Sequence, residues 1–480
     1  MDSNIVLEIF KEITKVPRES GHEEQIIAWL NAFAASHGLE SRTDEAGNVL
    51  IIKEASKGKE NVPTLVLQCH SDMVCEKNAG SSHDFSKDPV PYTIEDGWMV
   101  SHETTLGADD GIGMACALAL VSGKESTGRL EALFTVSEET GLDGAKALKK
   151  GFVSGRSLIN LDNEDEGEIC VGCAGGLDTT AKFRYSKTSV KKGRLAVKVA
   201  VDSCMGGHSG DDINRGRASA VVLLGRMLYR LRPLSYQLLA IDGGNKRNAI
   251  AREAWAVISL SERRLSALAD QLVAFKADVM EEFGNIEKNI QVYYTIENGA
   301  DYPFAIDAGT ARRLVDSIVA CPHGVLAMSQ EIPGFVETST NLASVKMTEE
   351  GVIRLGSSQR SCNTAARRAA GMKVEANFVM AGAYVEHEGE YPGWAPAVES
   401  PLRDACIASY RKLFGKSPKV RAIHAGLECG LFTEQYPDMD MIAIGPTLKG
   451  VHAPGERLDL ASLDRFVKHL EDLVTNFWQP

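Results

Sequence analysis

The first 160 residues of the chain alternate between short apolar runs and amphipathic stretches. Apolar runs of strand length occupy residues 48–52, 64–68, 130–136 and 157–161. Helical spacing occupies residues 4–14, 24–36, 110–123 and 143–150. Ser20 and Glu23 form a capping-box pattern before the second helix, and the polar segment between the first two strands suggests a hairpin-like pair. This alternation predicts an α/β fold in which a mostly parallel central sheet has helices on both faces.

The pattern changes between residues 187 and 388, where strands with alternating charged and apolar residues appear. The predicted strands are residues 194–201, 254–260 and 290–296, and the predicted helices are residues 218–231 and 266–283. This order indicates an α+β, ferredoxin-like domain, and residues 310–388 repeat it loosely. The α/β pattern then returns, with helices at 401–414 and 462–477 and a strand at 441–444. We therefore predict a catalytic domain of residues 1–186 and 389–480 and an inserted lid domain of residues 187–388.

Composition narrows the class of protein. At 480 residues the chain is longer than a domain with a single compact core, so two or more domains are expected. Its contents of 44% hydrophobic and 24% charged residues are ordinary for a globular enzyme. The formal charge of -13 argues against nucleic acid or an anionic membrane surface as a partner. No apolar run reaches the roughly 18 residues of a membrane span, and residues 1–13 lack the apolar segment of a secretory signal. The 10 scattered cysteines indicate free thiols in a reducing cytoplasm.

The candidate chemistry begins at residues 65–74, where an apolar strand ends in His70 and Asp72. Residues i and i+2 of a strand point to the same side, so this strand end offers an imidazole and a carboxylate to one point. Further imidazole or carboxylate candidates follow other apolar runs: Asp109, Glu138, Glu139, Asp162 and His452. Open α/β sheets bind ligands at the carboxyl ends of their strands. The sequence therefore predicts one polar site at this edge.

We interpret this set as a site for two divalent metal ions. Mixed imidazole and carboxylate ligands suit zinc, and also cobalt or manganese. Asp109 is the natural bridge, with one oxygen for each ion. Glu138 and Glu139 are adjacent and cannot both face one ion from a regular strand, so we assign Glu139 to the metal and Glu138 to proton transfer. Asp72 is expected to orient the imidazole of the neighbouring histidine and raise its basicity.

Each of these patterns has a simpler structural explanation when it is taken alone. The two acidic pairs could cap a helix or be solvated, residues 162–166 could form an acidic surface turn, and either histidine could be an ordinary hydrogen-bonded residue. The metal site is favoured because all five positions fall at predicted strand or loop ends of one α/β layer.

Seven motifs are spread along the chain between residues 69 and 456: CHSDMV, TTLGADDGIG, VSEETGLDGA, NLDNEDEG, GGHSG, HAGLECG and VHAPGE. Together they resemble the di-zinc exopeptidases, the family that includes aminoacylases, carnosinases and peptidase T, and within it the bacterial enzymes that cleave Xaa-His dipeptides. The resemblance implies one ion on His70, Asp109 and Asp162, and a second ion on Asp109, Glu139 and His452. It also implies that Glu138 is the general base, that Asp72 supports it, and that the peptide between Asp109 and Asp110 is cis.

The resemblance also implies roles for residues of the inserted lid domain and for one later glycine. His208 would help to hold the substrate carbonyl, often across a dimer, and Asn248 would act similarly. Arg360 would clamp the C-terminal carboxylate of the substrate with its guanidinium fork. Gly426 would contact the substrate through its backbone. These roles imply a homodimer formed through the lid domain, whereas residue type alone would make all four ordinary surface, cap or loop positions.

The activity that the resemblance implies is metal-dependent hydrolysis of β-Ala-His and other unblocked dipeptides, by a hydroxide held between two ions with Glu138 as base. Two alternatives remain open. One is an aminotripeptidase or N-acyl amino acid deacylase of the same fold. The other is a non-catalytic protein that binds metal or peptide and keeps the fold.

Overall fold

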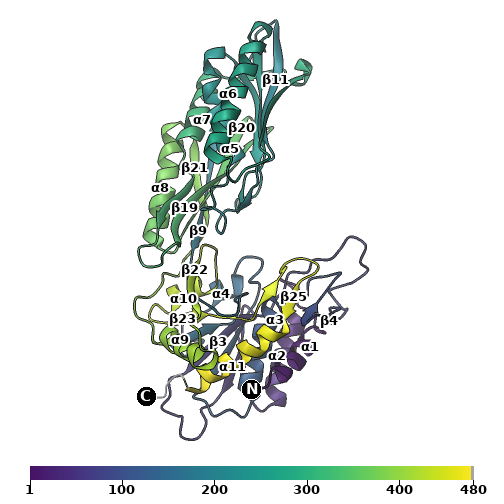
Figure 1. The fold of residues 1–480 in the computed structure, drawn as a ribbon, viewed down its shortest axis with the longest axis vertical. Helices are drawn as coiled ribbons and strands as arrows, with labels where there is room; N and C mark the ends of the chain where they lie inside the picture. The colour runs from purple at the N-terminus through teal and green to yellow at the C-terminus, as the bar shows by residue number, and fades with distance from the viewer. Residues whose placement is uncertain (477–480) are drawn as a thin grey trace. The chain divides into compact units, whose positions relative to one another are not determined.

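The structure is a computed structural model that describes residues 1–476 of the chain. The chain divides into two compact units, and Figure 1 traces their elements. Unit 1 comprises Met1–Cys173, Trp394–Ala422 and the segment that begins at Leu427, whereas unit 2 comprises Ala174–Gly393 and Ile423–Gly426. Unit 2 is therefore inserted into unit 1, but it begins before the expected position at residue 187. The reason is that β9 (Gly175–Arg184) pairs with β20 (Val352–Ser361) and β21 (Tyr384–Tyr391) of unit 2.

Unit 1 is built on an eight-stranded sheet with the order β1-β2-β6-β3-β7-β23-β8-β22. In that order the strands are Glu40–Thr43, Val49–Lys53, Leu130–Thr135, Leu65–His70, Ser157–Asn160, Asp440–Ala443, Glu168–Cys173 and Lys419–Ile423. The four strands from β6 to β23 are parallel, whereas β1–β2, β2–β6 and β23–β8 are antiparallel pairs. The sheet is therefore mixed, and the expected parallel arrangement is found at its centre.

The predicted hairpin of the first two apolar strands is wrong. β6 lies between β2 and β3, and β2 pairs instead with β1, a polar strand that the apolar pattern did not predict. Every residue of β3 is buried, and a strand that is buried on both faces belongs in the interior of a sheet rather than in a hairpin at its edge.

Helices of unit 1 fall close to the predicted positions. The predicted helices are α1 (Ser3–Ile13), α2 (Glu24–Ser36), α3 (Ala108–Ser122), α4 (Asp143–Ala147), α9 (Pro401–Phe414) and α11 (Leu460–Asn476), whereas α10 (Cys429–Gln435) was not predicted. Residues 477–480, which include the predicted last residue of the closing helix, lie outside the described residues. The capping box before α2 is wrong, because the Ser20 hydroxyl donates to Asp72 and the Glu23 carboxylate accepts from Ser137. Both side chains thus support the region around the strand ends.

A smaller sheet also belongs to unit 1. The sheet has the order β24-β25-β5-β4, formed by Leu448–Lys449, Arg457–Asp459, Trp98–Val100 and Thr93–Glu95. Within residues 1–476, no helix combines the length and the apolar composition that crossing a bilayer requires.

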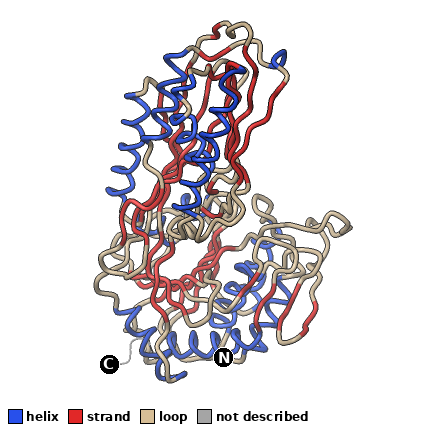
Figure 2. Tube along the Cα trace, turned by 45° about the horizontal axis from the view of Figure 1, so that its top comes forward, coloured by secondary structure: helices blue, strands red, loops and turns tan. Residues whose placement is uncertain are grey.

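Unit 2 contains two ferredoxin-like modules that share one antiparallel sheet (Figures 1 and 2). The first module is β11 (Arg194–Asp202), α5 (Ala220–Arg230), β13 (Gln237–Gly244), β15 (Ala254–Ser261), α6 (Leu265–Phe283) and β16 (Gln291–Glu297). The second is β9, α7 (Ala308–Ala320), β19 (Val336–Met347), β20, α8 (Thr364–Met380) and β21. Their sheet order, β16-β11-β15-β13-β19-β20-β9-β21, joins the modules through β13 and β19. The loose repeat expected after residue 310 is thus completed by an earlier strand, β9.

Short strands lie outside the main path of this sheet. β18 (Gly324–Met328) pairs with β19, β10 (Lys187–Thr188) with β17 (Ala305–Ile306), and β12 (Gly207–His208) with β14 (Ala249–Ile250). The four long helices and the sheet bury one common core, which includes Val221, Leu268, Leu314 and Val374. The sheet and helices of unit 2 therefore form a self-contained hydrophobic core.

Candidate metal centre

The predicted ligands follow the carboxyl ends of neighbouring parallel strands in unit 1. His70 is the last residue of β3, Glu138 and Glu139 lie in the turn after β6, and Asp162 lies two residues after β7. Because β6, β3 and β7 are adjacent and parallel, their carboxyl ends share one edge of the sheet. Asp109 joins them from the first turn of α3, and His452 from the loop between β24 and β25. The structure thus brings all the predicted ligands to one place.

Two ligand groups share the carboxylate of Asp109. Its Oδ1 lies 3.0 Å from His70 Nε2, and its Oδ2 lies 3.1 Å from His452 Nε2. Asp162 completes the first group, with Oδ1 3.9 Å from His70 Nε2, and Glu139 completes the second, with Oε1 2.8 Å from His452 Nε2. Within each group the ligand atoms lie within 4.8 Å of one another. This spacing is that of donor atoms around a cation, with Asp109 offering one oxygen to each group.

The charge of the site also fits divalent cations. Burial raises the pKa of Asp162 well above its usual value, and the nearby charge of Asp109 raises it further. Asp109 itself keeps a low pKa, because hydrogen bonds from His452 and His70 outweigh the effect of its burial. Buried carboxylates at such distances ionise together only when positive charge lies between them. Imidazole and carboxylate donors in this number are a ligand set that zinc, cobalt and manganese accept.

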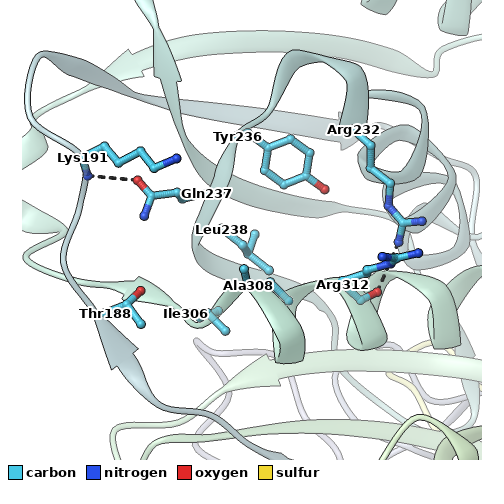
Figure 3. Close-up of a pocket in the computed structure, with 10 residues that line it drawn as sticks. Thr188, Lys191, Arg232, Tyr236, Gln237, Leu238, Ile306, Ala308 and Arg312 are labelled. Atoms are coloured by element: carbon cyan, nitrogen blue, oxygen red, sulfur yellow. Dashed lines mark hydrogen bonds between the residues drawn. The ribbon is translucent and has the colours of Figure 1, made fainter.

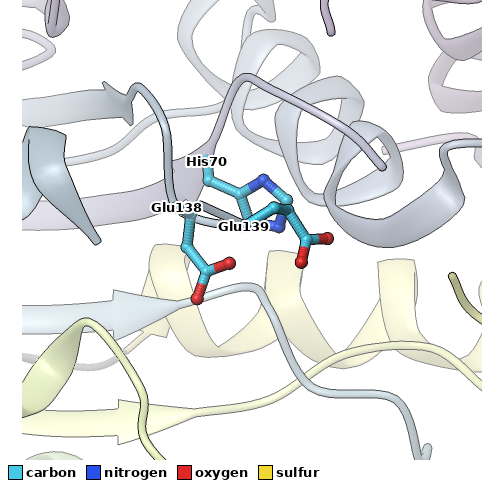
Figure 4. Close-up of side chains that lie close together, drawn as sticks. All are labelled: His70, Glu138 and Glu139. Atoms are coloured by element: carbon cyan, nitrogen blue, oxygen red, sulfur yellow. The ribbon is translucent and has the colours of Figure 1, made fainter. Parts of the chain in front are cut away.

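Glu138 and Glu139 do not behave as neighbours on a strand. Figure 4 shows both carboxylates on the same side as His70, and all three side chains offer atoms within 4.8 Å of one another. The premise that adjacent residues face opposite ways is wrong here, because the chain leaves β6 in a turn in which Ser137 has a φ of 52°. Burial raises the pKa of Glu138 to about 8, although His70 acts to lower it. A carboxylate with this pKa can take up a proton near neutral pH.

Asp72 contacts both the imidazole of His70 and the turn that contains Glu138 and Glu139. Its carboxylate Oδ1 lies 3.4 Å from His70 Nδ1, and its backbone carbonyl lies nearer to the same nitrogen, at 3.1 Å. The two carboxylate oxygens also accept hydrogen bonds from the backbone N–H groups of Glu138, at 3.0 Å, and Glu139, at 3.2 Å. Asp72 thus orients His70, as expected, and in addition fixes a turn that the sequence pattern did not connect with it.

Two buried residues that sequence reasoning missed complete the frame. Arg18 donates to the backbone carbonyls of Asp72, at 2.7 Å, Ser71, at 3.2 Å, and Gly107. The Glu456 carboxylate accepts from four consecutive N–H groups, those of Leu106, Gly107, Ala108 and Asp109, at 2.7 to 3.3 Å. It therefore holds the segment that presents the shared carboxylate. The peptide that follows, between Asp109 and Asp110, is cis, which confirms that expectation.

The predicted substrate residues all lie in unit 2. His208 lies in β12, and the backbone carbonyl of Asn248 accepts from Ser209 N at 2.8 Å, which fixes the ribbon of β12 and β14. Arg360 in β20 is only 8% exposed, and its Nε has no hydrogen-bond partner in the part of the chain that the structure describes. Gly426 lies against the ring of Tyr391, where an added Cβ would be 3.1 Å from a ring carbon.

Asp211 and His424 join these residues in unit 2 and were not predicted. Asp211 Oδ2 lies 3.2 Å from His208 Nδ1, and the charges of Arg360 and His424 act on Asp211 as well. The Nε2 atom of His424 lies 2.6 Å from the Ser339 hydroxyl. Burial, together with the positive charge of Arg360, lowers the pKa of His424 to about 4. The signal that could have found His424 is the HAGLECG motif, which contains it.

A cavity of about 470 Å³ lies elsewhere in unit 2 (Figure 3). Its lining residues include Leu238, Ile306, Lys191, Arg232 and Arg312. Arg232 is already paired with Asp316 at 2.6 Å. None of the predicted site residues lines this cavity, so the cavity is not part of the candidate site.

Comparison with known proteins agrees with this geometry. The family model of peptidase family M20/M25/M40 matches residues 66–476. The cytosol non-specific dipeptidase of Escherichia coli (strain K12) is 38% identical over 97% of this chain and 96% of its own. The crystal structure of aminoacylhistidine dipeptidase from Vibrio alginolyticus has a TM-score of 0.91 and 36% identity, and covers 98% of this chain and 96% of that one.

A more distant structure shares the fold. Aminopeptidase PepT from Bacillus cereus has a TM-score of 0.58 and 16% identity, with both chains covered completely. The family match spans most of the chain, and it includes every residue of the two ligand groups. This chain therefore belongs to peptidase family M20/M25/M40.

Proposed function

We propose that this chain is a metal-dependent dipeptidase that hydrolyses unblocked dipeptides, including Xaa-His dipeptides such as β-Ala-His. Two similar proteins with dipeptidase activity in their names, from E. coli and V. alginolyticus, support this substrate class. The observation that carries the proposal is the carboxylate of Asp109, which offers one oxygen to His70's group and the other to His452's group. A shared carboxylate between two donor sets is the arrangement that a two-metal hydrolase needs.

We propose two Zn²⁺ ions as the metals, with Co²⁺ or Mn²⁺ as alternatives. One ion would be held by His70, Asp109 and Asp162, and the other by Asp109, Glu139 and His452. When bound, such a pair polarises the scissile carbonyl and lowers the pKa of water. The donor set and the mutual distances of its atoms support this assignment.

Glu138 is the proposed proton carrier. Its carboxylate would accept the proton of the attacking water as the new C–O bond forms, and would then give that proton to the leaving amine as the C–N bond breaks. The hydrogen bond from its backbone N–H to Asp72 keeps the carboxylate close to His70.

The residues of unit 2 are proposed to bind the substrate. Arg360 would bind the C-terminal carboxylate, and its buried, unpartnered Nε supports a role for an anion there. His208 and Asn248 would donate to the substrate carbonyl, and Gly426 would offer its backbone. His208 would act across a homodimer formed through unit 2, so sedimentation of the active enzyme should give twice the 51.9 kDa of one chain. A monomeric active enzyme would contradict this part of the proposal.

We place the enzyme in the cytoplasm. The ten cysteines form no disulfide within the described residues and nine of them are buried, which suits a reducing compartment. The name of the E. coli relative, a cytosol dipeptidase, supports the same location.

A substrate panel tests the proposed function. The purified protein, loaded with Zn²⁺, Co²⁺ or Mn²⁺ in turn, would be given Xaa-His and other dipeptides, tripeptides and N-acetyl amino acids. Release of amino acids from the dipeptides alone is the expected result. Preference for tripeptides or acetylated amino acids would favour the alternative enzymes of the same fold. Bound metal without hydrolysis of any member would favour a binding protein.

A further inference from the structure

Three polar side chains are fully buried in the parallel centre of the unit 1 sheet. Gln68 lies in β3, Thr135 ends β6 and Asn160 ends β7, and each is 0% exposed. Gln68 is directly opposite Asn160 in the sheet, and Thr135 is opposite His70. Polar groups in such a place are costly unless they are hydrogen-bonded, so their partners indicate why they are there.

Glu428 connects this layer. It precedes α10, far along the chain, and is also 0% exposed. Its Oε2 accepts hydrogen bonds from Gln68 Nε2, at 2.6 Å, and from the Thr135 hydroxyl, at 2.8 Å. The Gln68 carbonyl oxygen in turn accepts from Asn160 Nδ2 at 2.8 Å. One buried carboxylate oxygen therefore ties together the carboxyl ends of three adjacent strands.

Each strand in this network leads directly to candidate ligands. His70 lies two residues after Gln68, on the same side of β3. Asp162 lies two residues after Asn160, and its backbone N–H donates to the Asn160 side chain at 3.3 Å. The turn that contains Glu138 and Glu139 begins just after Thr135. A change in the spacing of these three side chains would therefore move ligands of both metal groups.

We propose that Glu428 is a positioning residue for the metal centre, because its carboxylate sets the spacing of the strand ends of β3, β6 and β7 that lead to the ligands. The proposal rests on the proposed metal site. Glu428 acts through its ability to accept hydrogen bonds rather than through its negative charge, because both donors to Glu428 are neutral groups. The other oxygen, Oε1, has no hydrogen-bond partner among the described residues, so an amide at this position can keep both bonds.

The test compares Glu428→Leu with Glu428→Gln in the full chain. Glu131→Leu is the matched control, because Glu131 is a buried carboxylate at the opposite end of β6 that accepts from Ser154 and Gly155. Zn²⁺ affinity is measured by competition with a fluorescent chelator, and thermal unfolding of the metal-free protein is measured beside it. We expect Glu428→Leu to weaken Zn²⁺ binding about 10- to 100-fold, as the loss of a group that orients metal ligands does. Glu428→Gln should stay close to the wild type, and Glu131→Leu should lower the unfolding temperature without a change in Zn²⁺ affinity.

Three outcomes would overturn the proposal: wild-type Zn²⁺ affinity in Glu428→Leu, equal losses in Glu428→Leu and Glu428→Gln, or an equal loss of affinity in the control. If Glu428→Leu does not fold, Thr135→Val and Gln68→Met each remove one donor, and their losses of affinity should not add in the double variant, because both act on the same carboxylate. Additive losses of Zn²⁺ affinity in the double variant, or no loss in either single variant, would count against the proposal. Failure of the wild-type protein to cleave dipeptides while it binds Zn²⁺ would refute the dipeptidase assignment and leave this comparison valid.

Discussion

His452 Nε2 lies 3.1 Å from Asp109 Oδ2, although 343 positions separate the two residues in the chain. All of unit 2 is inserted between them. The contact exists because the loop after β24 returns to the first turn of α3, which the Glu456 carboxylate holds in place. The second ligand group therefore depends on a segment that enters the fold near the end of the chain.

Metal content should differ between variants of these two residues. Asp109→Ala removes a ligand from both groups, so we expect neither ion to be retained after gel filtration. His452→Ala removes a ligand from one group only, so one ion should remain. In both variants we expect turnover to fall more than about 100-fold, which exceeds the loss typical of a residue that only orients a ligand. Elemental analysis of the purified variants measures this. His102→Ala, an exposed histidine paired with Glu95, should keep both ions. Two retained ions in Asp109→Ala would contradict the bridging role.

Glu138→Ala should separate chemistry from metal binding. We expect kcat to fall about 10²- to 10⁴-fold, the range for loss of a general base, while both ions remain bound. The measurement is steady-state hydrolysis of an Xaa-His dipeptide beside elemental analysis. Asp143→Asn, an exposed carboxylate that follows the same turn, serves as the control and should behave as the wild type. Retained hydrolysis in Glu138→Ala would refute its assignment.

Local pattern predicted the site better than it predicted the sheet. The rule that i and i+2 share a side placed His70 with Asp72, and strand ends located Asp162 correctly in the fold. The same pattern could not show that β6 lies between β2 and β3, because the order of strands is a long-range property. Polar β1 gave no apolar signal at all.

Sequence reasoning missed Arg18 and Glu456 for the same physical reason. Arg18 and Glu456 act on backbone carbonyl and N–H groups, which every residue has, so no side-chain pattern identifies their partners. Glu138 and Glu139 were assigned from strand geometry, but the turn after Ser137 places both beside His70. A sequence shows which donor atoms are available, whereas the distances between elements decide which of them meet.

Arg360 should distinguish a free carboxylate from an amide at the C-terminus of a substrate. A hydrogen bond to a charged group contributes about 1.5–3 kcal/mol, so Arg360→Ala should lower kcat/KM for a dipeptide about 10- to 100-fold. The same variant should differ little from the wild type on the dipeptide amide, which has no carboxylate to lose. Arg368→Ala, an exposed arginine of α8, is the matched control. Equal losses on dipeptide and amide would show that Arg360 does not bind the carboxylate.

The stability of the protein should fall below neutral pH through His424, which is 5% exposed. Burial, helped by Arg360, lowers its pKa to about 4 in the folded chain, whereas an unfolded histidine has a pKa of about 6.5. Between these values the unfolded chain binds more protons, so the contribution of His424 to the free energy of unfolding is complete above pH 6.5 and declines as the pH falls toward 4. From pH 7.5 to pH 5 the decline amounts to about 2 kcal/mol.

His424→Gln keeps a group that can bond to the Ser339 hydroxyl but removes the titration. Thermal and urea unfolding at pH 7.5 and pH 5 should therefore show a smaller loss of stability in this variant than in the wild type, by about 2 kcal/mol. His22→Gln, an exposed histidine, should lose as much as the wild type does. The opposite ranking, in which His424→Gln loses more stability on acidification than the wild type, would mean that the folded state favours the charged imidazole.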